Sequence, residues 1–105
     1  MKITVEISKL FTGRTDNLKA ASNIVLEDGE DGEGERFIIK NVRIVEGDHG
    51  LFMSLPSRRN VNGEYKEMCY PLSATLRKRM SEAVLSAYEH ELQKTAENPD
   101  DIPSA

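Results

Sequence analysis

The feature that most constrains the fold is a change of hydrophobic period at Ser73. Before Ser73, apolar and polar residues alternate, as at Ile3, Val5 and Ile7, with the two-residue period of a half-buried strand. After Ser73, apolar residues recur at every third or fourth position, which is typical of an amphipathic helix. Strands followed by one helix predict an α+β domain, in which the helix packs on one face of an antiparallel sheet.

Five strands are predicted before Ser73, over residues 2–11, 18–26, 37–45, 51–55 and 64–70. The third is nearly continuous in Ile and Val, which favours a central strand or one covered on both faces. Pro56 should end the fourth strand because proline cannot donate to a sheet ladder. Asn62-Gly63 predicts a turn within the polar stretch 57–63. We therefore expect an antiparallel sheet of about five strands.

The helix is predicted to begin after Ser73, a good N-cap residue, and to end near Lys94. Its apolar stripe, which should dock on the sheet, consists of Leu76, Met80, Ala83, Val84, Ala87 and Tyr88. A chain of 105 residues is expected to form one domain, here residues 1–94. Residues 95–105 are predicted to be a disordered acidic tail.

Composition points to the cytoplasm. The N-terminus lacks the apolar segment of a secretory signal, and no stretch approaches the roughly 20 apolar residues of a membrane helix. Cys69 is the only cysteine, so no internal disulfide can form. We expect a cytoplasmic protein with no membrane partner.

The net charge of −4 is unevenly distributed along the chain. Residues 27–35 contain six acids and no base, and residues 80–105 contain six acids and one base. Between them, residues 58–79 contain six bases and two acids. The acidic pI of the whole chain is therefore a poor guide to what its basic segment binds.

The most informative basic cluster is Arg77-Lys78-Arg79, in the second turn of the predicted helix. Cations near a helix N-terminus oppose the macrodipole, which suggests that this cluster faces an anion such as a phosphate. The alternative is a solvated charged face with a Lys78–Glu82 pair at i, i+4.

A second basic group consists of Arg58 and Arg59 after Pro56, and Lys66 on the next strand. Arginines in a loop can bind phosphate oxygens with both arms of the guanidinium group or read guanine. Such a pair is more often solvated surface. The two basic groups would form one stripe if the fold brought them together.

Catalytic and metal chemistry have little support, so we predict a protein that is not an enzyme and holds no metal or cofactor. His49 and His90 lack ligand spacing. Cys69 has no base partner in the sequence and is interpreted as a buried structural residue. Tyr65, Tyr70 and Phe52 could stack on bases, but aromatic residues in strands usually pack in a core.

Several blocks together resemble the SpoVG family (stage V sporulation protein G). Residues 41–47 (NVRIVEG) and 50–59 (GLFMSLPSRR) resemble its signature. Tyr70-Pro71-Leu72 then precedes a helix with Arg77, Arg79 and the run 82–85, over a match of roughly residues 2–92. The acidic loop 28–35 departs from the family, as do Tyr70, where a histidine is usual, and the acidic tail.

The resemblance implies a cytoplasmic α+β protein that dimerises by pairing strands across subunits, has no small-molecule substrate, and binds DNA or RNA to regulate gene expression in sporulation or septation. It points to Arg58, Arg59, Arg77 and Arg79 as nucleic-acid contacts, and charge alone adds Lys66 and Lys78. The alternative is a protein-interaction adaptor in cell-division or sporulation control, which would dock partners through a sheet edge or the acidic loop.

Overall fold

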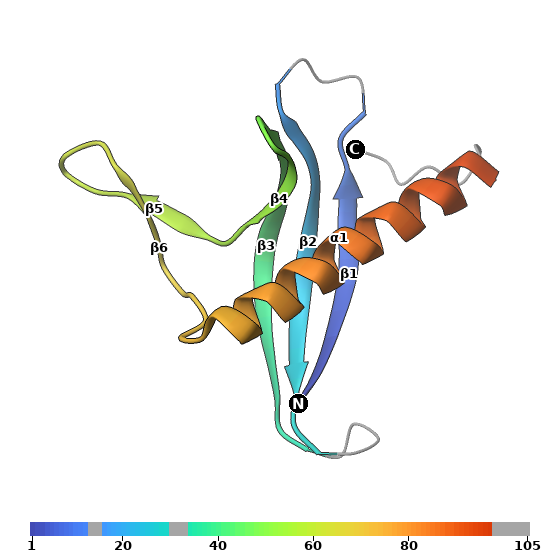
Figure 1. Cartoon of the computed structure of the whole chain (residues 1–105), viewed down its shortest axis with the longest axis horizontal. Coiled ribbons are helices and arrows are strands. Elements are labelled where there is room, and N and C mark those ends of the chain that lie inside the picture. The colour runs from blue at the N-terminus through green and yellow to red at the C-terminus, as the bar shows by residue number, and fades with distance from the viewer. Residues whose placement is uncertain (13–15, 30–33, 98–105) are drawn as a thin grey trace.

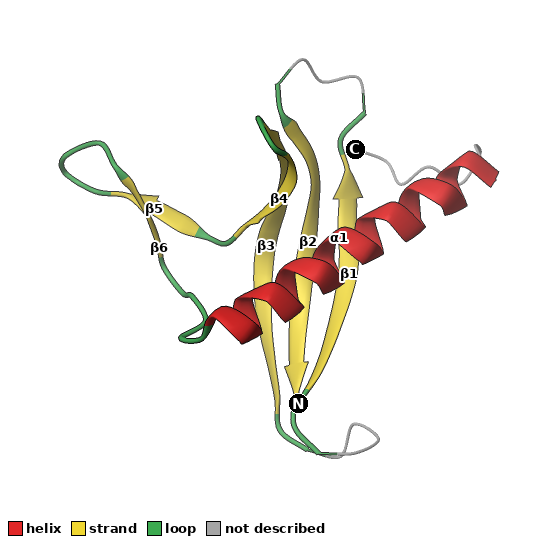
Figure 2. Cartoon of the chain, viewed as in Figure 1, coloured by secondary structure: helices red, strands yellow, loops and turns green. Residues whose placement is uncertain are grey.

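The computed structural model describes residues 1–12, 16–29 and 34–97, and it has the predicted α+β architecture (Figure 1). One antiparallel sheet has the strand order β1-β2-β3-β4. Its strands are β1 (Lys2–Leu10), β2 (Leu18–Glu27), β3 (Arg36–Gly47) and β4 (Gly50–Ser54). The helix α1 (Ala74–Glu97) crosses one face of this sheet diagonally and leaves the other face open (Figure 2).

The prediction of five strands in one sheet is wrong in one respect. The last predicted strand corresponds to β6 (Tyr65–Glu67), which pairs only with β5 (Ser57–Arg59). The strand β5 was not predicted, because it lies in the polar stretch 57–63 that was expected to form a turn. These two strands form a separate hairpin that projects from the main sheet (Figure 1). The physical reason is Pro56, which interrupts the ladder after β4 so that the next residues pair locally.

The central position predicted for the third strand is confirmed, because β3 lies between β2 and β4. It is covered on one face only. Val42 and Ile44 are buried against the helix side, whereas Ile38 and Arg43, which point to the other face, are exposed. A register shift between Ser22 and Ile24 of β2 leaves Lys40 and Asn41 as a bulge in β3.

The predicted helix start is confirmed by a capping hydrogen bond. The backbone N–H of Leu76 donates to the Ser73 hydroxyl at 3.0 Å. The helix ends at Glu97 rather than near Lys94. Met80, Val84 and Tyr88 of the predicted stripe are buried against the sheet.

The core lies between the helix and the inner face of the sheet. Leu10, Ala20, Ile44 and Met53 form one row across all four strands, because each is the register partner of the next. All four are buried. The buried Ser22 hydroxyl donates to the carbonyl of Val42 at 2.9 Å, so its burial leaves no unsatisfied donor.

The aromatic side chains of the predicted strands are not in the core, contrary to expectation. Tyr65 is 73% exposed, Tyr70 60% and Phe52 46%. Cys69, expected to be buried, is half-buried. These residues belong to the projecting hairpin, the linker after it and the open sheet face, where no second layer of the described chain covers them.

Some predictions fall outside the described residues. The middle of the acidic loop (30–33) and residues 98–105 of the tail are among them. The loop's described ends meet at the foot of the sheet, where the Asp28 N–H donates to the Glu35 carbonyl at 2.8 Å. The domain boundary at residue 94 and the disordered tail stay predictions.

Candidate functional site

The β5–β6 hairpin brings the loop arginines and Lys66 together. Arg58 and Lys66 are direct cross-strand partners, so their side chains share one face of the hairpin. Arg59 pairs with Tyr65 and lies on the opposite face. The two faces of a three-residue strand pair therefore carry three cations and one exposed aromatic ring.

The hairpin is held by its turn and its base. At the turn, the Asn60 side-chain oxygen accepts hydrogen bonds from the N–H groups of Asn62 and Glu64, both at 3.0 Å. Gly63 has a φ of 83°, the left-handed conformation that glycine adopts without strain. At the base, the Met68 N–H donates to the Pro56 carbonyl at 2.8 Å. The predicted Asn62-Gly63 turn is confirmed.

Few carboxylates neutralise the hairpin cations. Lys66 Nζ lies 3.8 Å from Glu64 Oε2, but both side chains are mostly exposed, and such pairs contribute little. Within the described parts of the chain, neither Arg58 nor Arg59 forms an ion pair. The hairpin therefore presents uncompensated positive charge to solvent.

Arg77 of the helix is joined to the hairpin by Glu67. Its guanidinium group makes a two-armed hydrogen bond to the Glu67 carboxylate, at 2.6 and 3.2 Å. This bond raises the pKa of Arg77 above its ordinary value, while burial opposes the rise. The anion suggested by the inverted helix dipole is thus supplied, for Arg77, by a residue of the same chain.

The other two helix cations point elsewhere. Arg79 donates to the Met1 carbonyl at 2.8 Å, at the foot of β1. Lys78 Nζ lies 4.0 Å from Glu82, the i, i+4 pair of the alternative interpretation. The fold therefore connects Arg77 with the hairpin group, whereas the described contacts of Lys78 and Arg79 are with other parts of the chain.

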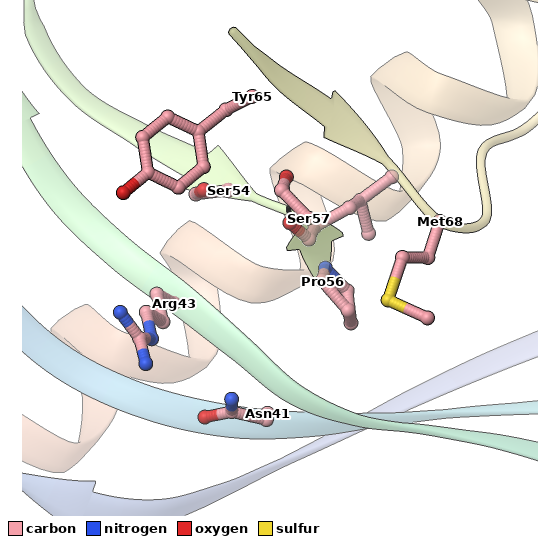
Figure 3. Close-up of a pocket in the computed structure, with 8 residues that line it drawn as sticks. Asn41, Arg43, Ser54, Pro56, Ser57, Tyr65 and Met68 are labelled. Atoms are coloured by element: carbon pink, nitrogen blue, oxygen red, sulfur yellow. Dashed lines mark hydrogen bonds between the residues drawn. The ribbon is translucent and has the colours of Figure 1, made fainter. Parts of the chain in front are cut away.

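A cleft of about 580 Å³ separates the hairpin from the open face of the sheet. We call it the hairpin cleft, and its lining residues are Asn41, Arg43, Ser54, Leu55, Pro56, Ser57, Tyr65 and Met68. Figure 3 shows Asn41 and Arg43 on the sheet side of the cleft. Tyr65 of β6 and Met68, which follows β6, lie on the hairpin side.

Sequence reasoning missed Asn41 and Arg43 as site residues. Both belong to an Ile- and Val-rich strand and to the block 41–47 that resembles the family signature, and neither observation predicts a binding role. Asn41 has a φ of 61°, a left-handed conformation that Asn tolerates better than most residues. A polar, turn-forming residue inside an apolar strand is the sequence signal that could have indicated this bulge.

The described residues contain neither a metal-ligand cluster nor a membrane-spanning helix. In residues 1–12, 16–29 and 34–97, no three His, Cys, Asp or Glu side chains are grouped so that they could hold a metal ion. The helix in this part of the chain is not apolar enough to cross a membrane.

Comparison with known proteins gives a consistent family match. The SpoVG family model matches residues 1–90. The SpoVG protein of Desulforudis audaxviator (strain MP104C) is 40% identical over 91 residues, covering 86% of this chain and 93% of that protein. The SpoVG protein of Treponema denticola is 39% identical over 90 residues, covering 85% and 87%. That of Macrococcus caseolyticus is 33% identical, covering 85% and 70%. All three relatives are named for septation.

Proposed function

Because this chain belongs to the SpoVG family, whose members are named for septation and sporulation, we propose that it is a nucleic-acid-binding regulator of gene expression in those processes. Its proposed interface consists of the hairpin cations Arg58, Arg59 and Lys66, extended by Arg77 and, along the helix, by Lys78 and Arg79. The protein acts as a cytoplasmic homodimer and performs no catalysis.

The observation that carries this proposal is the group of cations on the hairpin. A projecting hairpin can reach a phosphate backbone without interference from the rest of the domain. Arginine suits such a contact because its planar guanidinium group can bind two phosphate oxygens at once. Each neutralised phosphate also releases condensed counterions, which favours binding at low salt.

The position of the acidic loop also supports the hairpin as the nucleic-acid interface. The described ends of the acidic loop, Asp28 and Glu35, lie at the foot of the sheet beside the N-terminus (Figure 1). The hairpin projects from the opposite half of the molecule (Figure 1). A net acidic chain can therefore present a basic surface to nucleic acid.

Binding to labelled single- and double-stranded DNA and RNA across a salt series tests the proposal. We expect micromolar or tighter binding at low salt, with log K falling linearly with log salt because phosphate contacts release counterions. Absence of binding to a broad set of sequences at low salt would overturn the proposal.

Glu67 is expected to restrain binding, because it holds the Arg77 guanidinium group. Replacing it (Glu67→Gln) removes a negative charge beside the hairpin and releases Arg77 for a phosphate. We expect up to about tenfold tighter binding at 0.1 M salt, with the salt slope steeper by about 0.9. The matched control is Glu64→Gln on the same hairpin, whose longer and more exposed pair should matter less. Weaker binding by Glu67→Gln would contradict this prediction, since it would mean that the ion pair orients the hairpin.

A protein-interaction adaptor is the second candidate, and one observation favours it. An apolar groove of about 340 Å³ lies between the start of the helix, the end of β2 and the start of β3. Among its lining residues, Leu72 is 93% exposed and Phe37 63%. Exposed apolar surface of this kind is typical of protein contacts. Binding of a protein partner that persists after removal of the hairpin cations would support this candidate.

A further inference from the structure

We propose that the hairpin cleft binds one unpaired nucleobase, so that the protein prefers single-stranded to double-stranded nucleic acid. Tyr65 provides the stacking surface, and the side chains of Asn41 and Arg43 contact the base edge or its phosphate. This inference rests on the proposed function, and it adds the form of the nucleic acid and the residues that would select it.

The dimensions of the cleft suit a small planar ligand. Its volume of about 580 Å³ lies within the range of roughly 300–1,000 Å³ that is common for small-molecule sites. Its two walls come from different elements, the sheet on one side and the hairpin on the other (Figure 3). A base that leaves its strand could enter between them, whereas a paired base within a duplex could not.

Tyr65 is positioned to stack. Its side chain is 73% exposed although it belongs to a strand, so its ring is not used by the core. It shares a face of the hairpin with Arg59, its cross-strand partner. An exposed aromatic ring beside an arginine is the combination that proteins use to bind single strands, with the ring stacking on the base and the cation contacting the backbone.

Asn41 and Arg43 make the opposite wall polar. The bulge places Asn41 at the cleft, and its backbone N–H donates to the Asn23 side-chain oxygen at 3.3 Å, which helps to hold its left-handed conformation. Residues held in such conformations are concentrated at functional sites. An Asn amide can both donate and accept, as the edge of a base requires.

The charges along the cleft favour an anionic ligand, such as a nucleotide, over a basic or purely apolar one. Among its described lining residues there is one cation, Arg43, and no carboxylate. In the sheet register Arg43 shares a row with Ala21 and Lys9, so a second cation lies on the same open face. The phosphate of a bound base would therefore meet Arg43 on the sheet, and Arg59 lies on the same hairpin face as Tyr65.

The test uses a short single-stranded oligonucleotide that contains one 2-aminopurine, whose fluorescence falls when it stacks on an aromatic ring. With the full chain we expect quenching on binding, and tighter binding than to the corresponding duplex at the same salt. Tyr65→Leu keeps the apolar volume but removes the ring. It should abolish the quenching and weaken single-strand binding by about tenfold, within the range of one base-stacking contact. Tyr65→Phe should retain both.

Tyr70→Leu is the matched control, because Tyr70 is also exposed but does not line the cleft. This variant should quench the 2-aminopurine fluorescence and bind the single strand as the original protein does. If Tyr65→Leu binds and quenches like the original protein, the cleft is not a base site, although the proposed function stands. If the original protein binds no nucleic acid, the proposed function fails first. If Tyr65→Leu changes the molar mass of the protein in solution, Tyr65 belongs to a contact between two copies of the chain. That result would overturn the proposal.

Discussion

Simultaneous replacement of Arg58, Arg59 and Lys66 by Ala is expected to weaken nucleic-acid binding by about two orders of magnitude at 0.1 M salt. Each lost phosphate contact lowers the salt slope by about 0.9, so three contacts together lower it by nearly three. The unfolding transition should move little, because all three side chains are exposed and carry no strong ion pair. Affinity measured across a salt series gives both the loss and the slope.

A second triple variant separates local contact from net charge. Lys2→Ala, Lys19→Ala and Lys94→Ala together remove the same formal charge from other parts of the surface. We expect this control to bind within a few-fold of the original protein, because exposed charges farther than about 10 Å apart are largely screened at this salt. Equal losses in the two triple variants would show that overall charge, and not the hairpin, determines affinity.

The same comparison can be extended to the helix. Replacing Arg77, Lys78 and Arg79 by Ala removes an equal charge, and the described contacts predict a smaller loss than for the hairpin. Arg77 is already bound to Glu67, and Arg79 to the Met1 carbonyl. A larger loss than for the hairpin would move the interface to the helix start.

Ile24→Ala is expected to lower the free energy of unfolding by about 2–5 kcal/mol, through lost burial and the cavity left behind. Ile24 is fully buried in β2 and faces the helix. Small domains have total stabilities of about 5–15 kcal/mol, so the variant should lose a large share of its stability. Chemical denaturation monitored by circular dichroism measures the change.

Ile38→Ala is the matched control, because Ile38 lies in the neighbouring strand but on the open face, and is 48% exposed. Its truncation should cost less than about 1 kcal/mol. Similar losses at both positions would mean that the open face is also buried in solution, as it would be if a second subunit covered it.

The sequence alone predicted the secondary structure well, because it depends on local patterns. Alternation of Ile3, Val5 and Ile7 predicted β1, and the three- and four-residue spacing of Met80, Val84 and Tyr88 predicted the buried stripe of the helix. Ser73 predicted the helix start because N-capping needs only a side-chain oxygen and the following N–H groups. The family resemblance was also present in the order of its blocks, and the match over residues 1–90 confirms it.

The tertiary structure decided what those elements do together. Pairing of β5 with β6 outside the main sheet depends on competition between local and distant partners, which periodicity does not report. That choice brought Arg58 beside Lys66, connected Arg77 to Glu67 and left Tyr65 exposed. The hairpin cleft arises because a bulge aims Asn41 toward a hairpin that follows two strands later. Such a site depends on side chains from elements that meet only once the sheet has formed.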